Sequence, residues 1–85
     1  MSKNTELTNL YCSDNQLENL DVSKNTKLVV FDCSDNQLDT DSLNDLFGTL
    51  HSNYISITKN IYIGSNPGTN DCDRSIAEDK GWTVN

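Results

Sequence analysis

The chain has 85 residues, a formal net charge of −7 at pH 7 and 34% hydrophobic residues. This length fits one small domain, and the acidic balance argues against nucleic acid as a partner, because phosphate contacts require clustered lysine or arginine. The sequence contains no stretch long and apolar enough to cross a bilayer and no signal peptide, so we expect no membrane insertion.

A hexapeptide recurs unchanged 21 residues further along the chain. The segment Cys-Ser-Asp-Asn-Gln-Leu at 12–17 returns at 33–38, and the Asn-Thr-x-Leu at 4–7 returns at 25–28. A period of roughly 20 to 29 residues with leucine and asparagine at set positions is typical of a leucine-rich repeat. Such chains stack similar coils on one another instead of wrapping their elements around one central core.

Short alternating segments mark four expected strands. In each segment, apolar and polar side chains alternate with the period of a half-buried strand. The four segments are 10–12, 31–33, 61–63 and 82–84. The last segment follows the third by 21 residues, so we align Trp82 with Ile61. We therefore predict an α/β leucine-rich repeat solenoid in which one strand from each coil joins a short parallel sheet.

An asparagine follows each of the first three predicted strands, at Asn15, Asn36 and Asn66. This short side chain carries both hydrogen-bond donors and an acceptor, so at a sharp bend it can bind backbone groups that the strands leave free. A buried polar group without a partner costs about 1–3 kcal/mol. We therefore predict that the three side chains form a structural ladder of internal hydrogen bonds.

The first expected helix lies near 41–51. Its apolar side chains follow the helical spacing i, i+3, i+4 and i+7, at Leu43, Leu46, Phe47 and Leu50. Asp39 and Asp41 stand at its beginning, which suits the capping of free N–H groups and the positive end of the helix dipole. His51 stands near the other end, where the dipole favours a histidine on the surface.

A second helix is expected near 71–80. Asn70 or Asp71 can cap its N-terminus, because both side chains accept hydrogen bonds from free N–H groups. Gly81 is placed as a C-terminal stop. Both helices follow the regular repeats, so they thicken only the second half of the chain.

The repeat resembles that of bacterial secreted and cell-surface leucine-rich repeat proteins, Leu-x-x-Leu-x-Cys-x-x-Asn-x-Leu-x-x-Leu-Asp-Val-Ser-x-Asn. Residues 7–25 match this pattern position by position, and 61–84 resembles the closing segment of such proteins. We therefore expect the single domain 1–85 to consist of regular repeats over 1–38 and a C-terminal cap over 39–85.

The resemblance implies an extracellular or cell-surface location and a non-enzymatic function, the binding of another protein. It carries over no catalytic residue, metal or cofactor. Family arrays usually have more coils before this end. The alternative is therefore a structural end cap of a longer solenoid, without a ligand of its own.

The outward-pointing strand residues are the candidate ligand-binding residues, because in leucine-rich repeat proteins they line the concave face. They are Asn9, Tyr11, Ser13, Val30, Asp32, Ser34, Asn60, Tyr62 and Thr83. Tyr11, Asp32 and Tyr62 should stack across three strands, and tyrosine suits recognition because it offers a large area with a polar tip. The alternative is a solvated sheet face with ordinary cross-strand pairs.

The first coil is the candidate for self-association. We expect it to expose Leu7, Leu10 and Cys12 beside an unpaired strand edge at 9–13. Exposed edges invite pairing with another chain, so an isologous homodimer through this edge is a further expectation.

The cysteines are expected to be structural. Cys12 and Cys33 point inward on neighbouring strands, where free cysteine behaves as a small apolar residue. Strands about 4.8 Å apart could bring the two sulfurs together, but adjacent parallel strands rarely offer disulfide geometry. Cys72 should pack under the second helix. The chain lacks Cys-x-x-Cys spacing and a calcium-loop pattern, so we expect no metal site. We also expect no Cys–His catalytic pair at His51.

Overall fold

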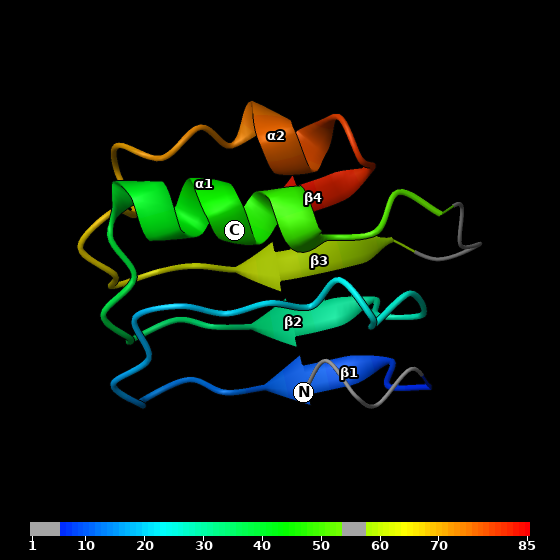
Figure 1. The fold of residues 1–85 in the computed structure, drawn as a ribbon, viewed down its shortest axis with the longest axis horizontal. Helices are drawn as coiled ribbons and strands as arrows, with labels where there is room; N and C mark the ends of the chain where they lie inside the picture. The colour runs from blue at the N-terminus through cyan, green and yellow to red at the C-terminus, as the bar shows by residue number, and fades with distance from the viewer. Residues whose placement is uncertain (1–5, 54–57) are drawn as a thin grey trace.

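The computed structural model describes residues 6–53 and 58–85, so 1–5 of the expected first repeat lie outside the described part. The described residues form four strands and two helices (Figure 1). In chain order these are β1 (Asn9–Tyr11), β2 (Val30–Asp32), α1 (Thr40–Thr49), β3 (Lys59–Tyr62), α2 (Ser75–Glu78) and β4 (Trp82–Val84). Within this part of the chain, no helix has the length and apolar character needed to cross a bilayer.

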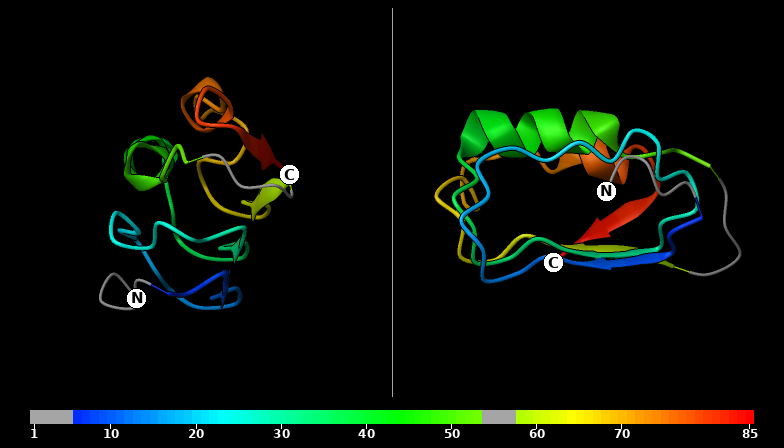
Figure 2. Two further views of the ribbon diagram at one scale, coloured as in Figure 1. Left: turned by 90° about the vertical axis from the view of Figure 1, so that its right-hand side faces the viewer. Right: turned by 60° about the horizontal axis from the view of Figure 1, so that its bottom comes forward.

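The strands form one parallel sheet in which β1, β2, β3 and β4 follow one another in chain order. After each of the first three strands the chain returns along the other side of the molecule, and we call one strand with its return segment a coil. Figure 2 shows the strands along one side of the molecule and both helices on the opposite side. The predicted four-stranded parallel sheet is confirmed.

The strands of the first three coils begin one or two residues earlier than predicted. β1 and β2 begin at Asn9 and Val30, and β3 begins at Lys59. The backbone ladder nevertheless continues past the strand ends, because the Cys12 N–H donates to the Asp32 carbonyl at 2.9 Å. The N–H of Cys33 donates in the same way to the carbonyl of Tyr62, at 3.0 Å. The predicted segments therefore lie within the paired region.

The last strand is shifted by two residues from the predicted alignment. The structure pairs Ile61 with Val84 and Lys59 with Trp82, so the alignment of Trp82 with Ile61 is wrong. A shift of two keeps each side chain on its expected face of the sheet. The indole explains the shift, because Trp82 Nε1–H donates to the His51 carbonyl at 3.0 Å and so fixes Trp82 near the end of α1.

The core lies between the sheet and the return segments. It contains inward strand residues and residues of α1, all almost completely buried: Phe31, Ile61, Trp82, Leu43, Leu46 and Phe47. Return segments add Val22, Leu28 and Leu38 to the same cluster. Residues from 1–38, the expected regular repeats, and from 39–85, the expected C-terminal cap, thus share one continuous apolar core.

The first helix begins one residue before its predicted start and ends two residues before its predicted end. The carboxylate of Asp39 caps it, since Oδ1 accepts the Ser42 N–H at 2.9 Å, and this hydrogen bond lowers the pKa of the Asp39 carboxyl. Leu50 is extended, so the helix stops at Thr49, although the Leu50 side chain stays buried. At that end Lys80 Nζ donates to the Gly48 and Leu50 carbonyls at 2.7 and 2.8 Å. The lysine thus provides hydrogen bonds to carbonyls at the C-terminal end of the helix, where the helix dipole favours a positive charge.

The second helix is much shorter than predicted. It covers only Ser75–Glu78, not 71–80, and neither candidate cap residue begins it. Two successive N–H groups, at 71 and 72, instead donate to the Gly68 carbonyl in a turn. The Asp73 carboxylate then accepts the Ser75 N–H at 3.1 Å, which starts the helix later. Gly81 ends this segment as predicted, with φ +86° and its N–H donating to the Glu78 carbonyl at 2.9 Å.

Gly68 permits the close approach of two coils, and this generates a first prediction. A Cβ at Gly68 would lie 2.3 Å from the Asp39 carbonyl carbon and the Thr40 nitrogen. We expect Gly68→Ala to lower the free energy of unfolding by about 3 kcal/mol, because backbone must move to relieve the overlap. The measurement is urea denaturation followed by Trp82 fluorescence.

Gly48→Ala is the matched control for this prediction. Gly48 is exposed on α1, and a Cβ there would have no atom within 4 Å. The substitution should raise stability by up to about 1 kcal/mol, because alanine is the better helix former. Equal effects of the two substitutions would contradict the close packing at Gly68.

Candidate functional site

The candidate ligand-binding residues share one face of the sheet, which we call the outward face. It comprises Asn9, Tyr11, Ser13, Val30, Asp32, Ser34, Asn60, Tyr62 and Thr83. Strand pairing arranges them in rows, one of which runs through Asn9, Val30, Asn60 and Thr83. Ser13 and Ser34 follow the ends of β1 and β2.

A second row of the outward face runs through Tyr11, Asp32 and Tyr62, as predicted. Tyr11 is 67% exposed and Tyr62 is 41% exposed, and they are the exposed large hydrophobic residues of the described chain. Parallel strands lie about 4.8 Å apart, so the two tyrosine positions are roughly 10 Å apart with Asp32 between them. The row therefore presents two aromatic rings on either side of one carboxylate.

Ser34 holds the Asp32 carboxylate in place. The Asp32 Oδ1 accepts the Ser34 N–H at 3.0 Å and the Ser34 Oγ–H at 2.6 Å. Asp32 is half-buried, so these two bonds restrict the side chain without removing it from the surface. Ser34 thus has a supporting role on the outward face.

Asn85, the residue after β4, also joins this row, and the sequence prediction missed it. Its N–H donates to the Ile61 carbonyl at 2.8 Å and its carbonyl accepts the Ile63 N–H at 3.0 Å, which places it opposite Tyr62. Its Nδ2 also donates to Asn60 Oδ1 at 3.3 Å. The predicted alignment put Thr83 opposite Tyr62, but the two-residue shift of β4 puts Thr83 opposite Asn60. The sequence contains no signal of that shift, because the Trp82 contact that explains it is visible only in the structure.

The asparagine ladder is confirmed in the second and third coils. Asn36 is buried, and its Nδ2 donates to the carbonyls of Cys12 and Cys33 at 3.1 and 3.0 Å. Its Oδ1 accepts the Leu17 N–H at 3.2 Å. Asn66 repeats the pattern, since its Oδ1 accepts the Asn36 N–H at 3.1 Å. Each amide therefore links its own coil to the one before.

Asn15 occupies the same place in the first coil but is exposed. Its Nδ2 donates to the Cys12 and Ser13 carbonyls at 2.8 and 3.1 Å, both within its own coil. Asp14, just before it, has a left-handed backbone with φ +59°. Asp35 and Ser65 share that conformation in the next two coils, so the same bend presents all three amides.

The ladder generates a second prediction, in which Asn36→Asp is compared with Asn15→Asp. Aspartate keeps the shape of asparagine but replaces the donating NH₂ with an oxygen that faces the same carbonyls. At the buried site we expect the free energy of unfolding to fall by about 3 kcal/mol, and at the exposed site by less than about 1 kcal/mol. Urea denaturation at pH 7 measures both. Similar losses at the two positions would rule out the ladder as the cause.

The three residues expected to be exposed at the open edge of the first coil are more buried than predicted. β1 is an edge strand, and Leu7 and Leu10 are half-buried. Cys12, expected to be exposed, is only 5% exposed and belongs to the core. Its Sγ–H donates to the Asp32 carbonyl at 3.3 Å, which turns the thiol toward the next coil.

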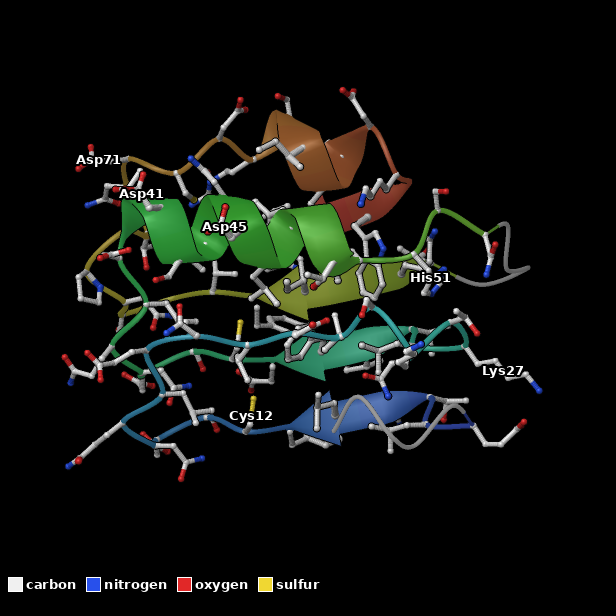
Figure 3. The ribbon with its side chains drawn as sticks, in the orientation of Figure 1. Cys12, Lys27, Asp41, Asp45, His51 and Asp71 are labelled. Carbon is white, nitrogen blue, oxygen red and sulfur yellow. The ribbon has the colours of Figure 1, made fainter. Side chains whose placement is uncertain are left out.

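All three cysteines are free thiols in the structure. Cys12 lies just beyond β1 (Figure 3), and burial, together with the nearby Asp32 charge, raises its pKa to about 11. Burial also raises the pKa of Cys33, whose Sγ–H donates to the Tyr62 carbonyl at 3.4 Å. Cys72 packs against the core, and burial raises its pKa. A raised pKa favours the unreactive thiol over the thiolate.

His51 is a structural residue, not the surface residue expected from the sequence. It follows α1 at the end of the molecule where the strands begin (Figure 3). Its Nε2 lies 2.7 Å from the Leu28 carbonyl, an acceptor, so this nitrogen carries the proton. Its Nδ1 accepts the Asn53 N–H at 3.1 Å, so both ring nitrogens are occupied by backbone groups.

A buried lysine, unexpected from the sequence, contacts the Trp82 ring, against which the His51 ring also packs. Lys59 Nζ donates to the carbonyls of Asn53 and Lys80 at 2.9 and 2.8 Å and lies 5.6 Å from the centre of the Trp82 ring. Burial lowers the pKa of Lys59. Among the residues that the structure describes, no group of three or more His, Cys, Asp or Glu side chains could hold a metal ion.

The chain matches no protein-family model, and neither curated proteins nor solved structures gave a significant match.

Proposed function

We propose that this chain is a leucine-rich repeat solenoid that binds another protein through its outward face. The 21-residue repeat and the asparagine ladder support the solenoid architecture. The observation that carries the binding function is the placement of Tyr11 and Tyr62, both exposed, in one row of the outward face. Tyrosine is enriched in protein interfaces because its ring contributes a large contact area and its hydroxyl a hydrogen bond.

The proposed module is non-enzymatic and acts outside the cell or at its surface. The His51 ring and the Lys59 ammonium, two groups that could serve in catalysis, are already bound to backbone. The sheet is only four strands wide, so the interface should lie below the roughly 800 Å² per partner of a standard complex. We therefore expect micromolar rather than nanomolar affinity for a partner.

The test is an array of purified extracellular protein domains probed with the labelled full chain. Partners should lose at least about tenfold in affinity for the double variant Tyr11→Ser/Tyr62→Ser, because aromatic anchors carry much of an interface's binding energy. Asn19→Ser is the matched control, since Asn19 is an exposed residue of a return segment. Circular dichroism would confirm that each variant is folded. Absence of partners, or partners indifferent to both tyrosines, would refute the proposed function.

A second candidate function is that of an end cap that self-associates through β1. Its support is the free edge of the sheet, flanked by the half-buried Leu7 and Leu10. The Thr8 carbonyl accepts the Val30 N–H at 3.2 Å, so the backbone groups of Asn9 point away from β2. They are available to a second copy of the chain.

Light scattering after size-exclusion chromatography tests this candidate across a concentration series. A homodimer would give twice the 9.5 kDa mass of the chain. Asn9→Pro should return the mass to one chain, because proline removes only the N–H that faces the free edge. A single-chain mass at every concentration would eliminate self-association.

A further inference from the structure

We infer that Tyr11, Asp32 and Tyr62 form a recognition site for an arginine side chain of the partner protein. The inference rests on the proposed function, since the arginine belongs to the protein that the outward face binds. It adds the chemistry of the contact, which the array experiment alone does not identify.

The geometry of the row suits a flat cation. Tyr11 and Tyr62 are two strands apart, with Asp32 on the strand between them. The strand positions are therefore roughly 10 Å apart. A guanidinium above Asp32 would lie within the roughly 6 Å over which an aromatic ring attracts a cation.

The carboxylate between the rings is already oriented. Asp32 Oδ1 accepts two hydrogen bonds from Ser34, while Oδ2 has no partner among the described residues. One oxygen thus fixes the side chain and the other remains available to a ligand. A group held in place before binding loses less conformational entropy when the complex forms.

No cation of the described chain neutralises this carboxylate. The other outward-face residues are uncharged, namely Asn9, Ser13, Val30, Ser34, Asn60 and Thr83. The ion pair in the described residues joins Lys27 to Glu6 at 2.7 Å. Lys27 projects from the end of the molecule at which the strands begin (Figure 3), whereas Tyr11, Asp32 and Tyr62 end their strands. The net charge of −7 further favours a cationic ligand.

Arginine fits this site better than lysine. Its planar guanidinium stacks on aromatic rings and can donate to a carboxylate at the same time. The lysine ammonium is a compact, strongly hydrated charge that gains less from flanking rings. The carboxylate at the centre of the row would repel the phosphates of a nucleic acid, which favours a protein side chain as the ligand.

The test is an NMR titration of the full chain at low salt with N-acetyl-L-arginine methylamide. We expect saturable shifts at Tyr11, Asp32 and Tyr62 with a dissociation constant in the millimolar range, since one side chain supplies few contacts. The citrulline analogue has nearly the same shape without the charge and should cause no saturable shift. Equal binding of the two probes, or no saturable shift with the arginine probe, would overturn the inference.

Two variants separate the site from the general charge of the molecule. Asp32→Asn keeps an oxygen that can accept from Ser34 but removes the charge, and it should weaken binding of the arginine probe about fivefold. Asp45→Asn removes the same charge from an exposed position on α1 (Figure 3) and should leave binding unchanged. An equal loss in both variants would show only long-range attraction and would also overturn the inference.

The outcomes distinguish this inference from the proposed function. If partners found on the array need Tyr11 and Tyr62 but bind Asp32→Asn as tightly as the unmodified chain, the proposed function stands and the arginine site fails. If the arginine probe binds as expected but no protein on the array does, the site stands and the proposed function fails.

Discussion

The hydrogen bonds of the buried asparagines are the constraint on which the rest of the structure depends. The Asn36 amide binds carbonyls of its own coil and of the preceding one, and the Asn66 amide does the same one coil later. An amide that joins two coils fixes both their separation and their register. The interval between ladder positions can therefore change from 21 residues, between Asn15 and Asn36, to 30, between Asn36 and Asn66, while the strands stay aligned.

The longer interval contains α1, which lies on the side of the molecule opposite the sheet (Figure 2). There α1 supplies Leu43, Leu46 and Phe47 to the core. In the shorter coils, residues of the return segments fill the corresponding space. The segment leading into β4 contacts the end of that helix. Lys80 there donates to the Gly48 and Leu50 carbonyls, and Trp82 donates to the His51 carbonyl. The fold thus accommodates a longer coil without disturbing the outward face.

That face follows from strand alternation once the register is fixed. A residue that points away from the core on one strand has an outward-pointing neighbour on the next, so Tyr11, Asp32 and Tyr62 come into one row. Their separation along the chain, with α1 between the last two, is irrelevant to their proximity. The same alternation directs Cys12 and Cys33 inward, where burial raises their pKa values and keeps them as thiols. The residues proposed for recognition and the residues of the core therefore occupy opposite faces of the same strands.

The sequence by itself determined the parallel sheet, the ladder at Asn36 and Asn66, and the Tyr11–Asp32–Tyr62 row, because each depends on local alternation and on a fixed repeat. Only the tertiary structure decided the register of β4, the length of α2, the backbone contacts of His51 and the burial of Lys59. Those features depend on contacts between distant segments: the Trp82 indole with the His51 carbonyl, the Asp73 N–H with the Asn44 side chain just before α2, and Lys59 with the Lys80 carbonyl. A repeat period records how coils resemble one another, whereas the closing coil is shaped by contacts that occur only once.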